Sequence, residues 1–153
     1  MCQAGYLSKN IFMRLKLFLL TISCGLFTYV NAQSKEDIEA VKVVCNYYLD
    51  GGTNGDSVMF SKAFSSGGQM QFMRNDTLVV ISLKDFMARQ RNTGQKTDRK
   101  TKIESVDVYG NAAVAKLTIE YPTFYFHDIM SLLKTKEGWK IVGKIFYREG
   151  KQK

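Results

Sequence analysis

Two apolar segments near the end of the chain constrain its fold most strongly. They span residues 126–134 and 139–146, are rich in β-branched and aromatic residues, and are separated by a short charged turn that contains Gly138. This pattern predicts a β-hairpin. The hairpin contains the only tryptophan and the only histidine of the 153 residues, so it also holds residue types that often carry chemistry.

The first 32 residues differ from the rest of the chain. After Met13, Arg14 and Lys16 precede an uncharged apolar stretch over residues 17–29, and small residues stand at Val30 and Ala32. A basic region, a short apolar region and small residues at the −3 and −1 positions predict a signal peptide over residues 1–32. We therefore expect an exported protein, periplasmic or secreted in a bacterium, with Met13 a more natural start than Met1.

Two alternatives for this segment stay open. One is a membrane anchor, which is disfavoured because the apolar run is shorter than the roughly 20 residues that span a bilayer. The other is lipidation at Cys24, which is disfavoured because the three preceding residues, Thr-Ile-Ser, lack the usual upstream leucine. Once residues 1–32 are removed, we expect no membrane association.

Cleavage changes the charge and the cysteine content. The segment carries three basic residues and no acidic one, so the net charge falls from +8 to +5, and Cys45 becomes the only cysteine. An exported domain without a disulfide depends on its core, and about 120 residues can bury enough surface for that. The remaining positive charge is spread out except at residues 89–102, where we expect a solvated basic loop and no nucleic-acid partner.

The front of the mature chain, residues 33–153, is predicted to be helical. Ser34 and the apolar spacing from Ile38 to Leu49 indicate a capped amphipathic helix that ends at the glycine-containing residues 50–55. Asp56 is positioned to cap a second short helix, and Ser82 a third. Between these two short helices, residues 69–81 read as a small hairpin that turns at Asn75 and Asp76.

The back of the chain is predicted to be strands. Residues 101–109 and 112–121 form a hairpin in which Ala113, Ala115, Leu117, Ile119 and Tyr121 share one face. Helices first and an antiparallel meander afterwards indicate an α+β domain with helices on one face of a sheet. Residues 91–100 are polar and are expected to form a mobile loop.

The order of these elements and four motifs resemble the nuclear transport factor 2-like (NTF2-like) superfamily. The motifs are Tyr-Tyr-Leu-Asp-Gly at 47–51 with Gly-Asp at 55–56, residues 105–116, residues 128–134 and Gly-Trp-Lys-Ile-Val at 138–142. Within this superfamily, which includes ketosteroid isomerases and SnoaL-like cyclases, the chain is most similar to the family labelled "putative lumazine-binding". The resemblance implies a curved sheet wrapped around the N-terminal helices as a cone, an apolar pocket at its open end and often a homodimer through the outer sheet face. It implies no known reaction.

His127 and Asp128 are the first residues to suspect of chemistry. Neighbouring residues in a strand point to opposite faces, so the two cannot form a dyad unless a bulge intervenes. If Asp128 faces the interior, burial would favour its neutral form, as in a general base of an isomerase of this fold. The alternative, which we favour, is a carboxylate near the rim of the pocket that is satisfied by a backbone or tyrosine donor.

Other chemistry has little support in the residue inventory. One histidine and one mature cysteine cannot build a typical zinc or copper site, and no cluster of carboxylates has ligand spacing. Cys45 lies on the apolar face of the first helix and is expected to be a core residue. Gly51-Gly52 and Gly67-Gly68 lack the lysine of a phosphate loop. We expect no metal and no cofactor.

The abundant aromatic residues fill the core, and some of them are candidates to line a pocket. By parity we expect Tyr121 on the inner strand face and Tyr48 on the inner helix face, with Asp128 as a polar contact and Trp139 on either side. These four are the predicted ligand-binding residues, and Asp128 is the one catalytic candidate.

Three functions follow as hypotheses. The first is an exported, non-enzymatic protein that binds a small apolar or aromatic molecule, as a homodimer. The second is an isomerase-like or dehydratase-like enzyme with a pocket aspartate or tyrosine as acid and base. The third is a module whose outer sheet face binds another protein.

Overall fold

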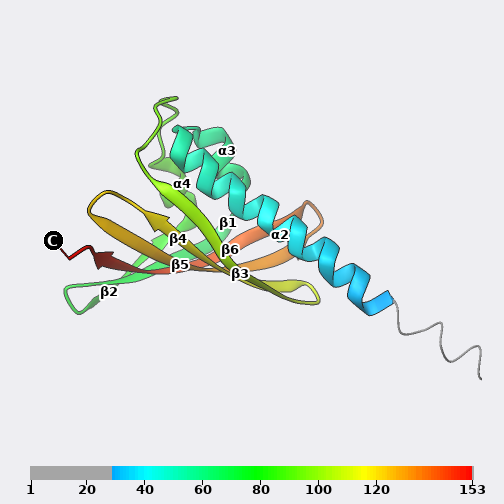
Figure 1. Cartoon of the computed structure of the whole chain (residues 1–153). Coiled ribbons are helices and arrows are strands. Elements are labelled where there is room, and N and C mark those ends of the chain that lie inside the picture. The colour runs from blue at the N-terminus through cyan, green and yellow to red at the C-terminus, as the bar shows by residue number, and fades with distance from the viewer. Residues whose placement is uncertain (1–28, 153) are drawn as a thin grey trace, which may run out of the picture. The chain divides into compact units, whose positions relative to one another are not determined.

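The computed structural model of the protein describes residues 29–152, with side chains from Lys35 onward. Met13, Cys24 and most of the predicted signal peptide lie outside the described residues. Residues Glu36–Lys153 form one compact unit, whose elements are labelled in Figure 1. Among the described residues, no helix is both long and apolar enough to cross a membrane.

Helix α2 spans Tyr29–Asn54, so its predicted start is wrong, whereas it ends within the predicted stop at residues 50–55. Ser34 lies inside the helix rather than at its N-cap. The helix continues through Gly51. The backbone of Phe60 packs closely against this position, since a Cβ on Gly51 would lie 2.7 Å from the Cα of Phe60. The chain leaves the helix after Asn54 at Gly55, whose φ of 63° lies in the left-handed region that glycine tolerates.

The two short helices begin where the capping residues predict. In α3, Ser57–Lys62, the Asp56 side chain accepts a hydrogen bond of 2.8 Å from the backbone N–H of Met59. In α4, Leu83–Ala88, the Ser82 hydroxyl accepts one of 3.0 Å from the backbone N–H of Asp85. Each cap satisfies a backbone donor that has no partner within the helix.

Strands β1, Phe64–Arg74, and β2, Thr77–Ser82, form the predicted small hairpin. Its turn residues, Asn75 and Asp76, both have positive φ, as two-residue hairpin turns require. Strand β1 begins earlier than predicted, at Phe64, and its pairing with the sheet is interrupted between Phe64 and Gln69. This irregular first part explains why the sequence pattern indicated a strand only from residue 69.

The remaining strands form the predicted antiparallel meander. They are β3, Lys100–Tyr109; β4, Ala112–Glu120; β5, Phe124–Thr135; and β6, Gly138–Gly150. The six-stranded sheet has the order β2-β1-β6-β5-β4-β3. Strand β1 runs parallel to β6, a pairing that was not predicted, and the other neighbours are antiparallel. The predicted α+β class, with helices first and a curved sheet after them, is confirmed.

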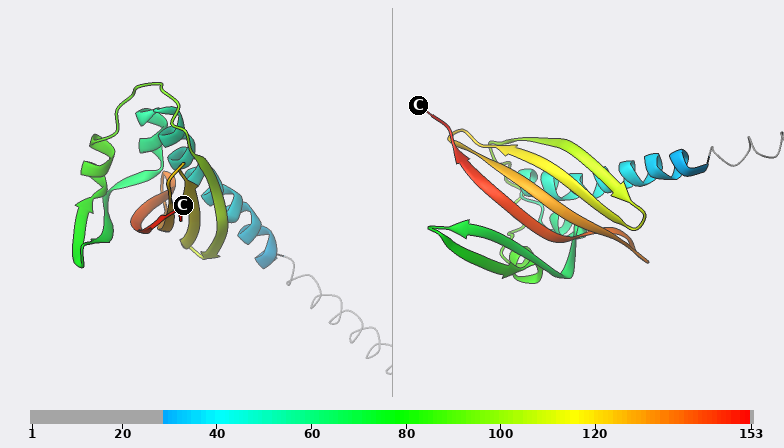
Figure 2. Two further views of the ribbon diagram at one scale, coloured as in Figure 1. Left: turned by 60° about the vertical axis from the view of Figure 1, so that its left-hand side comes forward. Right: turned by 90° about the horizontal axis from the view of Figure 1, so that it is seen from below.

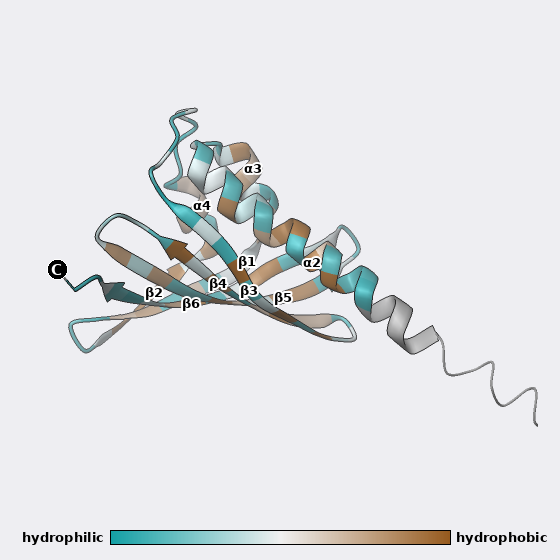
Figure 3. Cartoon of the chain, in the orientation of Figure 1, coloured by the Kyte–Doolittle hydropathy of each residue, from teal (hydrophilic) through white to brown (hydrophobic). Residues whose placement is uncertain are grey.

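Strand alternation divides the sheet into a buried and an exposed face. Ala113, Ala115, Leu117 and Ile119 are all buried, as predicted, while Lys116 between them is exposed. The buried side chains of α2 belong to the same core cluster as those of β4, and Figure 3 shows that α2 carries hydrophobic as well as hydrophilic positions. The sheet curves, and the loop after α4 passes over to β3 (Figure 2).

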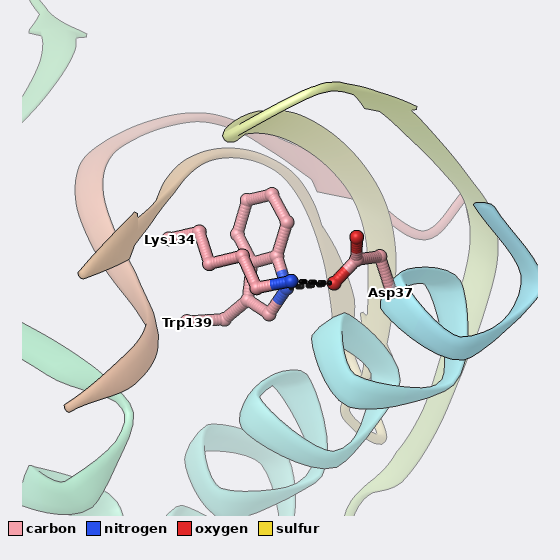
Figure 4. Close-up of polar contacts among 3 residues, drawn as sticks. All are labelled: Asp37, Lys134 and Trp139. Atoms are coloured by element: carbon pink, nitrogen blue, oxygen red, sulfur yellow. Dashed lines mark hydrogen bonds and ion pairs between the residues drawn. The ribbon is translucent and has the colours of Figure 1, made fainter. Parts of the chain in front are cut away.

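The β5–β6 hairpin is held against α2 by the carboxylate of Asp37. Asp37 accepts hydrogen bonds from the Lys134 ammonium, at 2.7 Å, and from the Trp139 indole N–H, at 3.0 Å (Figure 4). Both donors come from the turn end of the β5–β6 hairpin, about one hundred positions away in the sequence. These contacts, first from Lys134 and then from Trp139, lower the pKa of Asp37.

The lowered pKa of Asp37 predicts that the stability contributed by its contacts with Lys134 and Trp139 is lost in acid. Ionised Asp37 stabilises the fold above its ordinary pKa of 3.8, and the contribution is lost as the pH falls through the lowered value. We expect Asp37→Asn to lower the melting temperature between pH 5 and 8, and the difference from the wild type to shrink below about pH 4. Because Lys134 is 44% exposed, added salt should also reduce the difference. A gap between the two melting curves that is the same at pH 3 and pH 7 would contradict this role.

Candidate functional site

Asp128 and His127 lie on opposite faces of β5, as strand alternation predicts. The imidazole of His127 is on the exposed face, 2.8 Å from a carboxylate oxygen of Glu149. The Asp128 side chain is fully buried on the inner face. The two residues therefore form no dyad with each other.

Asp128 is held instead by Tyr48 and Lys144. The Tyr48 hydroxyl, on α2, donates a hydrogen bond of 2.7 Å to Oδ2 of Asp128. The Lys144 ammonium, on β6, forms an ion pair with Oδ1. All three residues are buried, and this buried cluster joins the helix to the two central strands. The tyrosine donor that we favoured is present, but the carboxylate is fully buried rather than near the rim, and it also pairs with a lysine that the sequence analysis did not identify.

The surroundings shift the pKa values of Tyr48 and Lys144 in opposite directions. Burial, reinforced by the adjacent Asp128 carboxylate, raises the pKa of Tyr48 well above its usual value, so the phenol keeps its proton. Burial lowers the pKa of Lys144, while the Asp128 carboxylate opposes this shift. The Lys144 nitrogen also lies 5.2 Å from the ring centre of Tyr48 and 4.9 Å from that of Phe146, and such contacts favour the cation.

A cavity of about 860 Å³ opens beside this cluster. Its walls come from α2, α3, α4, the β1–β2 hairpin, strands β4 to β6 and the loop before β3. Its aromatic lining consists of Tyr48, Phe60, Phe72, Phe86, Tyr121, Phe126 and Phe146. A volume of this size and an aromatic lining are typical of a small-molecule site.

Two of the four predicted binding residues line this cavity and two do not. Tyr48 and Tyr121 are in its wall. Asp128 is not among the lining residues, although its carboxylate contacts Tyr48 and Lys144, which are. Trp139 is buried at the turn end of the hairpin, where its N–H donates to Asp37. Trp139 therefore helps to hold the hairpin against α2 through Asp37. Its predicted ligand contact has no support in this geometry, because Trp139 does not line the cavity.

The sequence analysis missed the basic residues of the site. Lys144, Arg74, Arg89, Arg99 and Arg148 all line the cavity. The expectation that the cluster at residues 89–102 is a solvated loop is wrong for Arg99, which is half-buried and hydrogen-bonded within the protein, whereas Arg89 is exposed as expected. Simple alternation from the buried Trp139 and Ile141 would place Lys144 on the opposite face, and only the irregular pairing between Ser131 and Leu132 brings it to the face of Asp128. No local signal distinguishes Arg99 from its polar neighbours.

The other sequence-based expectations concern Cys45 and metals. Cys45 is fully buried in the core, and burial raises the pKa of its thiol to about 12, which makes it unreactive at neutral pH. Among the described residues, no group of three or more His, Cys, Asp or Glu side chains is placed to hold a metal ion.

Comparison with known proteins identifies the family. A family model described as "Putative lumazine-binding" matches residues 36–147. The chain belongs to this family. A comparison with curated proteins finds no match.

Solved structures agree with this membership of the putative lumazine-binding family. An NTF2-like protein of unknown function from Shewanella baltica OS155 has 27% identity and a TM-score of 0.66, covering 80% of this chain and 97% of its own. One from Methylobacillus flagellatus KT has 27% identity and a TM-score of 0.65, covering 74% and 93%. A ketosteroid isomerase-like protein from Erwinia carotovora atroseptica, with 12% identity, a TM-score of 0.58 and coverage of 74% and 96%, shares the fold alone. The predicted NTF2-like fold is confirmed.

Proposed function

We propose that this protein binds a small aromatic or apolar molecule in the cavity beside the Tyr48–Asp128–Lys144 cluster, and that it does so as an exported protein without catalysing a reaction. The observation that carries the proposal is the cavity itself, which stays open although seven aromatic side chains line it. Membership of a family named for lumazine, a fused two-ring heterocycle, agrees with a ligand of this kind.

The state of Asp128 favours binding over catalysis. A general base must reach the proton that it removes, within about 3 Å or through one water. The Asp128 carboxylate already accepts a hydrogen bond from the Tyr48 hydroxyl and pairs with Lys144, and Asp128 is not among the residues that line the cavity. Tyr48 is a poor base as well, because its raised pKa keeps it protonated and its hydroxyl is engaged.

The proposal of export rests on the first 32 residues. Their basic start, apolar stretch and small residues at Val30 and Ala32 fit cleavage after Ala32. N-terminal sequencing of the protein recovered from a bacterial host would test it, with Gln33 expected as the first residue.

A thermal-shift panel of aromatic and steroid-like compounds, with lumazine included, tests ligand binding. A ligand present at about 100 times its Kd should raise the melting temperature by about 10 °C. The variant Ile81→Trp, which places a large ring in the cavity wall, should abolish the shift. Val80→Trp is the matched control, because Val80 precedes Ile81 on β2 and is exposed. A shift that survives Ile81→Trp, or the absence of any shift across the panel, would contradict the proposed site.

We further propose a homodimer through the outer sheet face. This face exposes a group of apolar side chains around a groove of about 600 Å³, namely Met73, Leu78, Ile129, Ile145 and Tyr147. Lys116, Thr118 and Glu104 line the same groove, which gives the apolar group a polar border like that of protein interfaces. A second copy would present the same surface and bury the apolar groups of both.

Ile145→Asp should separate this dimer. Ile145 is 51% exposed, so the change should affect association more than folding. We expect sedimentation to give a dimer for the wild type and a monomer for the variant, at concentrations of about 10 μM. A wild type that sediments as a monomer would contradict the dimer and favour a different protein as the partner of this face.

A further inference from the structure

The charges around the cavity are of one sign. Five basic side chains line it, and no aspartate or glutamate does. The sequence as a whole contains 22 basic and 14 acidic residues, so the lining is far more one-sided than the chain. Lys144 is buried and Arg99 is half-buried, whereas Arg74, Arg89 and Arg148 are exposed. A pocket whose only requirement was an apolar ligand would have no use for a half-buried cation such as Arg99, because burying a charge near apolar groups costs free energy.

Only one of these five charges is neutralised by a carboxylate. Lys144 pairs with Asp128. None of the ion pairs among the described residues includes an arginine. Arg74, Arg89, Arg99 and Arg148 therefore bring four positive charges to the cavity without a carboxylate partner there.

Arg99 is the most constrained of the four. It is half-buried just before β3, and its guanidinium donates to three neutral oxygens: Thr53 Oγ1 at 2.9 Å, the Tyr121 hydroxyl at 2.9 Å and the Leu49 carbonyl at 2.8 Å. These bonds fix the plane of the guanidinium and use three of its five N–H groups. A side chain held in this way is preorganised, so an anion that pairs with the remaining N–H groups loses little entropy by ordering it.

Arg148 approaches the same place from β6. Its guanidinium carbon lies 4.0 Å from the ring centre of Phe124, and Phe124 stacks on Tyr121 with ring centres 4.6 Å apart. Tyr121 in turn accepts the hydrogen bond from Arg99. Arg148 thus lies over Phe124 and Arg99 donates to Tyr121, so each of the two stacked rings contacts a guanidinium group.

We propose that the ligand of this cavity is a small aromatic anion, whose carboxylate, sulfonate or phosphate group pairs with Arg99 and Arg148 while its ring packs on the aromatic lining. This inference rests on the proposed binding function and narrows it to one class of ligand. Guanidinium groups suit it, because they bind such oxyanions with two parallel hydrogen bonds and also stack on aromatic faces.

Two dyes that differ in a single group give the test. 8-Anilinonaphthalene-1-sulfonate carries a sulfonate, and N-phenyl-1-naphthylamine is the same ring system without it. Both fluoresce more strongly in an apolar site, so the Kd of each can be measured by titration of the full chain. We expect the sulfonate dye to bind about tenfold more tightly at low salt and to lose most of this advantage in high salt, while the neutral dye changes little.

Variants assign the effect to the proposed residues. Arg99→Met should raise the Kd of the sulfonate dye to about that of the neutral dye and leave the neutral dye unchanged. Unchanged binding of the neutral dye also reports that the cavity is intact. Arg148 is exposed, so Arg148→Met gives a second measurement should Arg99→Met fold poorly. Arg91→Met, which removes an exposed arginine outside the cavity lining, is the matched control and should have no effect on either dye.

The outcomes separate the two proposals. If both dyes bind equally, or the neutral dye binds more tightly, and Ile81→Trp abolishes both, the cavity binds ligands but the inference about the anion is wrong. If the sulfonate dye is preferred but Arg99→Met and Arg148→Met change nothing, the inference is also wrong. If neither dye binds, or Ile81→Trp leaves both Kd values unchanged, the proposed binding site fails and this inference fails with it.

Discussion

Lys144→Met is expected to lower the free energy of unfolding by about 3–5 kcal/mol, the usual cost of removing one member of a buried ion pair. The reason is that Asp128 would stay buried on the inner face with its charge uncompensated, since both side chains of the pair are almost completely shielded from water. Urea denaturation monitored by the fluorescence of Trp139 measures this directly, because the single tryptophan is buried at the same hairpin.

Two further variants make the Lys144→Met experiment specific. In the double variant Lys144→Met with Asp128→Asn, no charge is buried and the amide oxygen can still accept from Tyr48, so most of the lost stability should return. Lys116→Met, on the exposed face of β4, removes a lysine without disturbing the cluster and should change stability by less than about 0.5 kcal/mol. Equal losses for Lys144→Met and Lys116→Met would show that the buried pair contributes nothing.

Gly51→Ala is expected to destabilise the protein by about 1–3 kcal/mol, the cost of inserting one extra group into a packed interior. In an isolated helix the same change would be stabilising by about 1 kcal/mol, because alanine is the better helix former. Here the new methyl group would meet the backbone of α3, including the Phe60 Cα at 2.7 Å and the Asp56 carbonyl oxygen at 3.0 Å. Backbone atoms cannot rotate away, so α2 and α3 must separate.

The matched control for Gly51→Ala is Gly67→Ala. A Cβ on Gly67 would have only the Ser65 hydroxyl oxygen near it, at 3.9 Å, so this variant gains the same methyl group without a clash. Thermal or urea unfolding of both variants decides the matter. A Gly51→Ala variant that is as stable as the wild type would mean that the two helices are not packed as closely as described.

The features that the sequence predicted correctly are local ones. Asp56 and Ser82 cap helices because a side-chain oxygen meets a backbone N–H three positions away, and this geometry needs no knowledge of the rest of the fold. The separation of His127 from Asp128 follows from the pleat of a single strand. Such features depend on neighbouring residues alone, and they proved correct.

The features that could not be predicted from the sequence depend on residues far apart in the chain. Gly51 and Gly52 stop a helix by local preference, but the approach of α3 and of Arg99 makes glycine the residue that fits inside it. Arg99 contacts Thr53, Tyr121 and Leu49, which are 46, 22 and 50 positions away from it in the sequence. Nothing near Arg99 in the sequence indicates those partners. The parallel pairing of β1 with β6 likewise joins two strands that are far apart in the sequence.

The candidate site was predicted in part for the same reason. Tyr48 and Tyr121 were placed on inner faces by periodicity, and both line the cavity. Lys144 was overlooked because a lysine in a strand is usually exposed, and only the partner carboxylate on β5 makes its burial tolerable. The identity of the ligand-facing charges therefore emerges from the fold rather than from any motif.

The buried ion pair between β5 and β6 also has a consequence for how the chain finds its fold. A hairpin that slips by one residue turns every side chain of one strand to the opposite face. Such a slip would carry Lys144 to the outer surface and leave Asp128 alone in the interior, at a cost of several kcal/mol. The observed hairpin contains one such step, between Ser131 and Leu132, and this step brings Lys144 to the face of Asp128. The buried pair therefore stabilises this alignment of the two strands over the regular one.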